Sequence, residues 1–169
     1  MGYVNNTQMS LFIPPANIQK TAGTWTPTLT SNVLADVRTA ADASFTLFIP
    51  IPLPANAAVK AGAKLKSIDV YYKILTAAAD DFATVELEKM ALKATGSIPT
   101  GAAVTTTEDS GHDAAAERKA TGDHTMTVTI TSPAYLDEDD HYVLELIVDA
   151  AATTVFSIYG ARANYELRI

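Results

Sequence analysis

The densest group of side chains that could do chemistry is the acidic run Asp137-Glu138-Asp139-Asp140. Calcium takes oxygen ligands, and carboxylates are prominent among them. However, the run lacks the Asp-x-Asp-x-Asp-Gly pattern of a calcium loop, and consecutive carboxylates point in different directions. A solvated loop between two strands is the favoured interpretation. A calcium site formed by Asp137, Asp139 and Asp140 is the alternative.

Residues for nucleophilic or metal chemistry are sparse. The chain has no cysteine, which excludes disulfides, thiolate metal sites and a cysteine nucleophile. His112, His124 and His141 show no metal-binding spacing. We predict surface or strand-end positions for His124, which precedes a strand, and for His141, which opens one. Ser110-Gly111-His112-Asp113 resembles a triad only in sequence, because triad residues are rarely adjacent in a chain, and no Gly-x-Ser-x-Gly motif occurs. We therefore predict no enzymatic activity and no cofactor.

Exposed aromatic side chains on one face of a sheet would form a platform for carbohydrate. Trp25, Tyr71, Tyr135 and Tyr159 are the candidates in this sequence. Single aromatic residues on strands more often pack against neighbouring strands or in the core. Packing is thus the favoured interpretation, and a binding platform stays open as the alternative.

Charge and hydropathy exclude several partners. The net charge of −7 argues against nonspecific binding to nucleic acid, which needs clustered Lys and Arg. No stretch reaches the roughly 18 apolar residues of a membrane span, and no signal-peptide pattern opens the chain. We expect neither nucleic acid nor membrane as a partner. We also expect synthesis in a cytoplasm, with the protein either staying there or leaving by assembly and lysis.

Period-2 alternation of apolar and polar residues predicts the elements that must position these side chains. Such alternation buries one face of a strand and leaves the other in water. The sequence is therefore predicted to be all-β, an antiparallel two-sheet β-sandwich, jelly-roll-like, with about eight strands. Residues 23–169 would form this single domain. The clearest strand candidates lie at 23–30, 43–49, 65–75, 84–92, 125–131, 141–149 and 154–169.

Two of these strands have further expectations attached. Residues 65–75 and 84–92 are interpreted as a hairpin, with an amphipathic helix over 76–94 as the alternative. The strand at 43–49 runs into prolines 50, 52 and 54, which predicts an extended sheet edge because proline lacks a ladder donor.

Two other segments are irregular. Residues 93–123 form a long connection, which either contains an irregular strand around 102–107 or projects as an interaction loop. Gly160 interrupts the last strand and predicts a β-bulge.

Residues 1–22 are predicted to be an N-terminal arm. Leu11, Phe12 and Ile13 make it apolar enough to dock on a partner, and the segment is too short to fold alone. These three residues, with Trp25, are the predicted interface.

The strands also carry a resemblance. The segments AGAKLKSIDVYYKI, ATVELEKMAL and HTMTVTITSPAYLDEDDHYVLELIVDAAATTVFSIYGARANYELRI resemble surface proteins of tailed-phage and prophage virions. A YxLxLxV strand followed by an IYGAxxxY strand is the shared pattern, and the similarity covers about half of the chain.

This resemblance implies a non-enzymatic virion protein, either capsid decoration or part of a tail fibre or spike. It implies a homo-oligomer, most often a trimer, with a major capsid or tail protein as partner and assembly in the host cytoplasm. The alternative is a carbohydrate- or receptor-binding module of a tail fibre or spike, with or without calcium at the acidic run.

Overall fold

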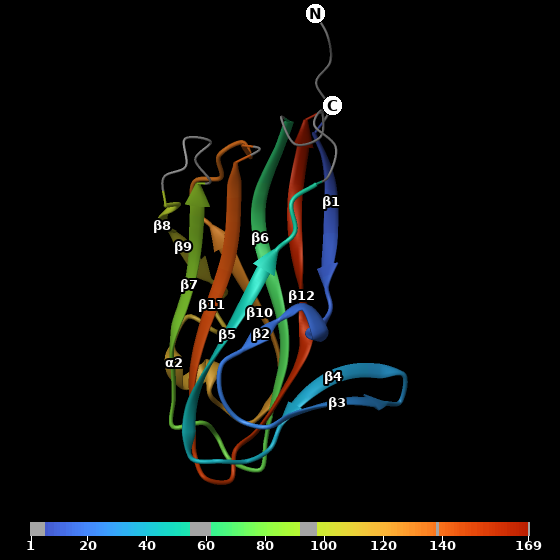
Figure 1. Ribbon diagram of the computed structural model, residues 1–169, viewed down its shortest axis with the longest axis vertical. Helices are drawn as coiled ribbons and strands as arrows, with labels where there is room; N and C mark the ends of the chain where they lie inside the picture. Colours follow the sequence, from blue (N-terminus) through green and yellow to red (C-terminus); the bar gives the residue numbers. More distant parts are fainter. Residues whose placement is uncertain (1–5, 55–61, 92–97, 138, 169) are drawn as a thin grey trace, which may run out of the picture.

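The protein is an antiparallel β-sandwich in the computed structural model, which describes residues 6–54, 62–91, 98–137 and 139–168 (Figure 1). The larger sheet has the strand order β3-β4-β12-β6-β10-β9, and β1 also pairs with β12. The smaller sheet has the order β2-β5-β11-β7-β8. The strands are β1 (Asn6–Ile13), β2 (Gln19–Lys20), β3 (Trp25–Thr30), β4 (Val33–Arg38), β5 (Ala43–Ile51), β6 (Ala63–Leu75), β7 (Asp81–Ala91), β8 (Thr100–Val104), β9 (Thr106–Glu108), β10 (Gly122–Ile130), β11 (Asp140–Ala150) and β12 (Val155–Arg168).

The predicted two-sheet antiparallel sandwich is thus confirmed, with twelve described strands instead of about eight. The additional strands are short or lie where the apolar spacing is irregular, as in β2, β4, β8 and β9. The remaining elements are the short helix η1 (Pro15–Asn17) and the single-turn helix α2 (Ala115–Arg118).

The core lies between the two sheets. The even-numbered apolar residues of β11, from Tyr142 to Val148, are buried and face those of β6, from Ile68 to Ile74. Burying one face of each strand supplies the main free-energy gain of folding, about 25 cal/mol per Å² of apolar surface. The opposite face of the larger sheet is left for solvent or for a ligand.

The predicted hairpin of β6 and β7 is wrong, and so is its helical alternative. β6 lies between β12 and β10 in the larger sheet, whereas β7 lies between β11 and β8 in the smaller one. Thr76 adopts a φ of 71°, and the turn after it carries the chain from one sheet across to the other. The two strands pack face to face across the core, which the same alternation in sequence allows equally well.

Two other structural expectations hold. Prolines 50, 52 and 54 lie at the end of β5 that β2 leaves unpaired, because β2 reaches only Leu47 and Phe48. The connection after β7 contains the short strands β8 and β9, which match the irregular strand predicted around 102–107.

The first residues of the described chain lie against their own subunit. β1 pairs with β12 from Asn6 to Ile13, and β2 pairs with β5. Ile13 and Ile18 are buried in the core. Exchange of this segment between subunits stays a prediction.

The β3–β4 hairpin projects from the lower part of the larger sheet (Figure 1). Ser31 and Asn32 both have positive φ, 52° and 66°, as the tight turn of a two-residue hairpin requires. At its base the buried Arg38 donates to the carbonyls of Ala41 and Ala43, each at 3.1 Å. Lys20 pairs with Asp36 at 2.7 Å, which ties the hairpin to the segment that leads into it.

Candidate functional site

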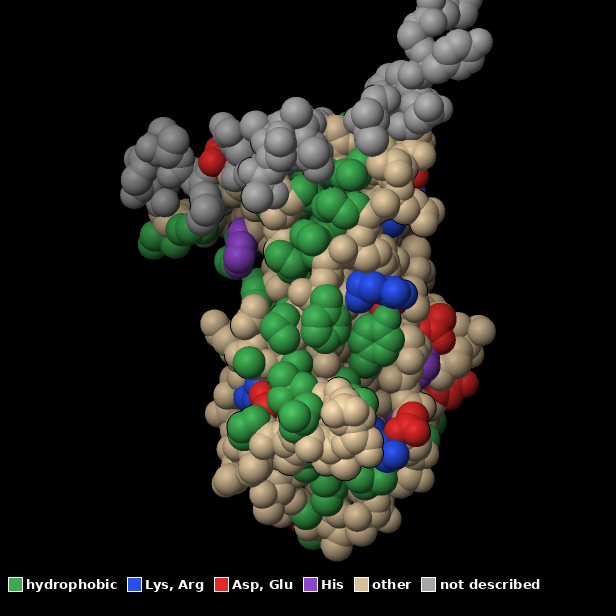
Figure 2. Space-filling model, turned by 90° about the vertical axis from the view of Figure 1, so that its right-hand side faces the viewer, with side chains coloured by type: hydrophobic (Ala, Val, Ile, Leu, Met, Phe, Trp, Pro, Cys, Tyr) green, Lys and Arg blue, Asp and Glu red, His purple; other side chains and the backbone are tan. Residues whose placement is uncertain are grey.

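A groove lies between the projecting hairpin and the outer face of the larger sheet. Its volume is about 700 Å³, which is in the usual range for small-molecule sites. Figure 2 looks onto the side of the molecule that carries β1 and the hairpin, and shows hydrophobic side chains gathered over the middle of this face. The floor is formed by Tyr71, Lys73 and Leu75 of β6, Asp123 and Thr125 of β10, and Ser157 and Tyr159 of β12; the hairpin wall is formed by Thr28, Thr30, Ser31, Val33, Ala35 and Val37, and Phe12 also lines the groove.

A β-bulge places Tyr159 in the floor. Ile158 pairs with Tyr72 and Gly160 pairs with Tyr71, so Tyr159 between them has no partner on β6. Before the bulge the odd-numbered residues of β12 face outward. After it the even-numbered residues do, with Arg162 exposed. The predicted bulge at Gly160 is therefore confirmed, and its consequence is an extra aromatic side chain on the outer face.

Gly160 also makes room for Phe12. The glycine has a φ of +121°, and a Cβ there would lie 2.9 Å from Cζ of Phe12 and 2.5 Å from the carbonyl oxygen of Ile13. The Phe12 ring therefore lies close against the backbone of β12, although 61% of the residue stays exposed. Phe12, Tyr71 and Tyr159 together give the groove three aromatic rings on paired strands.

One ion pair stands in the groove floor. Lys73 on β6 and Asp123 on β10 are register partners, and their Nζ and Oδ1 atoms are 2.9 Å apart. The hydrogen bond with Asp123 raises the pKa of Lys73 above its ordinary value. The pair offers an acceptor beside a donor, while the lysine charge is largely compensated.

A second polar group borders the aromatic floor on the same face of the sheet. Asp69 on β6 accepts hydrogen bonds from Arg162 at 2.7 and 3.0 Å, from Asn164 at 3.0 Å and from Thr127 at 2.8 Å. Burial would raise the pKa of Asp69, but the hydrogen bonds from Asn164, Arg162 and Thr127 outweigh it and lower the pKa. Both of these Arg162 hydrogen bonds go to one oxygen of Asp69, and about half of the arginine side chain, 49%, stays exposed.

A partly buried cluster of Asp109, His112 and His124 adjoins the groove, which His124 also lines, and sequence reasoning missed it. His112 lies 2.8 Å from Oδ1 of Asp109 through Nδ1 and 3.2 Å from Nδ1 of His124 through Nε2. The His124 ring stacks on Tyr72 at 4.6 Å. Asp109 also accepts the backbone N–H of Thr127 at 2.7 Å. The cluster fastens the loop before β10 to the sheet, and only the Asp-x-x-His spacing of residues 109 and 112 hinted at it.

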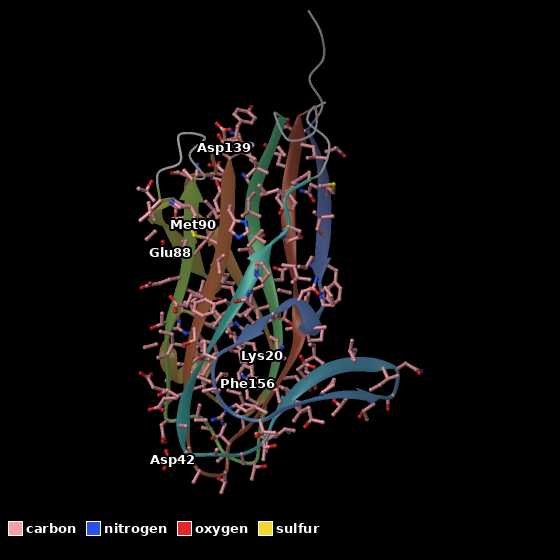
Figure 3. All side chains as sticks on the ribbon, in the orientation of Figure 1. Lys20, Asp42, Glu88, Met90, Asp139 and Phe156 are labelled. Carbon is pink, nitrogen blue, oxygen red and sulfur yellow. The ribbon has the colours of Figure 1, made fainter. Side chains whose placement is uncertain are left out.

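The residues predicted for calcium lie at or just before the start of β11. Asp140 is buried and pairs with Lys89 at 2.8 Å, and its Oδ2 accepts the backbone N–H of Asp137 at 3.1 Å. Asp139 lies at the end of the sandwich away from the hairpin (Figure 3). Within the described part of the chain, no group of three or more His, Cys, Asp or Glu side chains could hold a metal ion.

Of the four residues predicted as an interface, Phe12 is the exposed one. Phe12 is exposed in the groove, whereas Leu11 is half-buried and Ile13 is buried. Trp25 packs edge-on against Phe45 and Phe156 with ring centroids 5.4 and 6.4 Å apart, inside the base of the hairpin near the Phe156 labelled in Figure 3.

Two of the four candidate platform aromatics, Tyr71 and Tyr159, thus meet in the groove. Tyr135 is exposed outside the groove, with Nζ of Lys64 4.5 Å above its ring.

Among the described residues, no helix is both long enough and apolar enough to cross a membrane.

Comparisons with known proteins identify no family. No family model matches the chain, and no match is found among curated protein sequences. Solved structures with some similarity include a family two carbohydrate esterase from Cellvibrio japonicus, with 7% identity, a TM-score of 0.40, and coverage of 97% of this chain but 34% of that chain. A carbohydrate esterase from Shiga toxin-encoding bacteriophage phi24B has 14% identity, a TM-score of 0.42, and coverage of 96% and 100%. A family 11 carbohydrate-binding module from Clostridium thermocellum, in complex with a mixed-linked tetrasaccharide, has 9% identity, a TM-score of 0.36, and coverage of 96% and 89%.

These similarities carry no argument about function, because the identities are low and every TM-score is below 0.5. The fold class rests on the strand pairing itself.

Proposed function

We propose that this protein is a non-enzymatic carbohydrate-binding module that holds a neutral oligosaccharide in the groove beside the β3–β4 hairpin. The observation that carries the proposal is the set of three aromatic rings at the groove, Phe12, Tyr71 and Tyr159. A pyranose ring has an apolar face of C–H groups, which packs on an aromatic ring, and a rim of hydroxyls, which need donors and acceptors. The groove supplies both kinds of surface.

The polar side chains suit hydroxyl groups. A sugar hydroxyl can donate to Asp123 while it accepts from Lys73, because the two charged atoms are 2.9 Å apart. Thr28, Thr30 and Thr125 line the same groove and add hydroxyls that donate and accept. These side chains lie on or next to paired strands, so little conformational entropy is lost when a ligand orders them.

The charges favour a neutral ligand over an acidic one. Lys73 is the only lysine or arginine among the described residues that line the groove, and Asp123 compensates its charge. Arg162, on the same outer face, is paired with Asp69. The net charge of −7 would also repel an anionic glycan over about a Debye length, roughly 8 Å at physiological salt.

An array of immobilised neutral and acidic oligosaccharides tests the proposal, followed by calorimetric titration of the neutral glycan that binds best. Tyr71→Ala and Tyr159→Ala should each weaken binding by about tenfold or more, since each removes a stacking surface. Tyr135→Ala is the matched control, because Tyr135 is also exposed but lies outside the groove, and it should bind like the wild type. Binding that survives loss of both Tyr71 and Tyr159, or that is restricted to acidic glycans, would contradict the proposal.

We infer a second candidate function, that of a structural protein of a phage particle, from the outer surface of the hairpin. Leu29 and Leu34 are register partners that are 71% and 44% exposed. Exposed apolar pairs of this kind often mark a contact with another protein. Capsid, portal or tail genes beside the gene for this chain would support this role, and a neighbourhood of carbohydrate-metabolism genes would oppose it.

A further inference from the structure

The sheet edges of this protein are protected unequally. An open strand edge presents unpaired N–H and C=O groups, and proteins blunt such edges with proline, charge or short strands. β3 carries Pro27, and the free end of β5 carries Pro50. β2 has two residues and includes Lys20, β9 has three residues and includes Glu108, and β8 has five residues with Gly101 among them.

β1 has none of these devices. Its eight residues, Asn6–Ile13, contain no charged residue, no proline and no glycine. It pairs with β12 on one side, and no described strand pairs with its other side. Figure 1 shows β1 at the margin of the larger sheet, above the hairpin. Among the described edges, β1 is the long and uncharged one, and such an edge is a template for another strand.

We propose that β1 of a second copy of this chain pairs antiparallel with β1 across a two-fold axis centred on Ser10. The two larger sheets then continue into each other. A two-fold axis perpendicular to a sheet leaves the inward face of both copies on the same side. Residues directly opposite each other must then point to the same face, and because side chains alternate along a strand, their residue numbers must sum to an even value. With Ser10 opposite the second copy's Ser10, Met9 meets the second copy's Leu11 and Thr7 meets the second copy's Ile13.

The composition of β1 points to a copy of itself as the partner. Pairing of identical strands places like residues close together, so a charged strand would repel its copy, whereas β1 carries no charge. The inward-facing Met9 and Leu11 are both half-buried in the single chain, and the pairing covers each with the other. Because the whole chain carries −7, two copies repel at long range, and the dimer should strengthen as salt screens this repulsion.

Single-cysteine cross-linking tests the pairing and its register. The chain has no native cysteine, so a Ser10→Cys variant has one thiol. Opposed residues of antiparallel strands have Cα atoms about 4.5–5.5 Å apart, within the range for a disulfide. Ser10→Cys should oxidise to a linked dimer, while the control Thr26→Cys, exposed on the edge strand that Pro27 blocks, should stay monomeric.

Sedimentation of the unmodified chain supplies the second measurement. The expected mass is twice the 17.9 kDa of one chain. The double variant Gln8→Lys/Ser10→Lys should raise the dissociation constant of the dimer by about tenfold or more. Thr26→Lys is the control and should leave the dimer unchanged. Circular dichroism checks that each variant is folded. A monomer at 100 μM, equal cross-linking of the two cysteine variants, or an assembly that the lysines leave intact would overturn the proposal; a trimer, as the phage resemblance implies, would do so as well.

Discussion

Replacing Gly160 with alanine tests how the bulge builds the groove. A side chain at this position meets two independent penalties. The φ of +121° is unfavourable for any residue with a Cβ, at a cost of about 1–3 kcal/mol. The Cβ would also lie 2.5 Å from the carbonyl oxygen of Ile13 and 2.9 Å from the Phe12 ring, and overpacking of this kind costs about 1–3 kcal/mol. Gly160→Ala should therefore lower the free energy of unfolding by about 2–6 kcal/mol.

Two other glycines separate the penalties. A Cβ on Gly122, with a φ of +146°, would meet no atom within 4 Å, so Gly122→Ala carries the backbone cost alone. Gly101 has no positive φ, and a Cβ added there would lie no closer than 3.8 Å to another atom, Oε2 of Glu88. Gly101→Ala should therefore be nearly neutral. Urea unfolding of the three variants gives the differences directly. Equal stabilities for Gly160→Ala and Gly122→Ala would refute the steric account of the bulge.

Three further outcomes are expected. Burial would raise the pKa of Asp69, but hydrogen bonds from Asn164, Arg162 and Thr127 outweigh it, and burial of Asp109 is likewise outweighed by hydrogen bonds from the Thr127 N–H, His112 and the Gly111 N–H, so both pKa values are lowered in the folded protein. The stability that these two carboxylates contribute is complete above the unfolded pKa near 4 and is lost as the pH falls through the folded pKa values. Asp69→Asn should therefore flatten the acid limb of a curve of stability against pH, and an unchanged acid limb would contradict this. Chelation of calcium should leave glycan binding unchanged, since Asp137, Asp139 and Asp140 do not line the groove, and a loss of binding with EDTA would restore the calcium alternative. Lys20→Met leaves Asp36 without its ion-pair partner at a place where the two side chains are nearly buried, 11% and 13% exposed. The substitution should lower the free energy of unfolding in urea by about 3–5 kcal/mol. A loss below about 1 kcal/mol would contradict this and mean that water solvates the pair.

The fold class could be predicted from the sequence because alternation fixes which strands exist and which faces they bury. It does not fix strand partners: β6 and β7 alternate as a hairpin would, yet the turn at Thr76 carries the chain to the other sheet. A short strand such as β2 escapes prediction because pairing with a neighbour, rather than its own residues, makes it a strand.

The site could be predicted only in part. Tyr71 and Tyr159 stand out as aromatic residues on strands, but their meeting depends on the bulge that turns Tyr159 onto the outer face. Phe12 was predicted as a contact residue, and nothing in the sequence places its ring against Gly160. The Asp109–His112–His124 cluster is formed by tertiary folding across a loop, which residue spacing does not encode.

The most direct test of the central claim is the mapping of amide chemical shifts during titration of the wild-type protein with the neutral oligosaccharide that the array selects. Binding in the groove predicts that the perturbed amides belong to β6 around Tyr71, β10 around Asp123, β12 around Tyr159 and the hairpin strands β3 and β4. Shifts clustered around Asp137–Asp140, or no saturable shift at millimolar oligosaccharide, would contradict the claim.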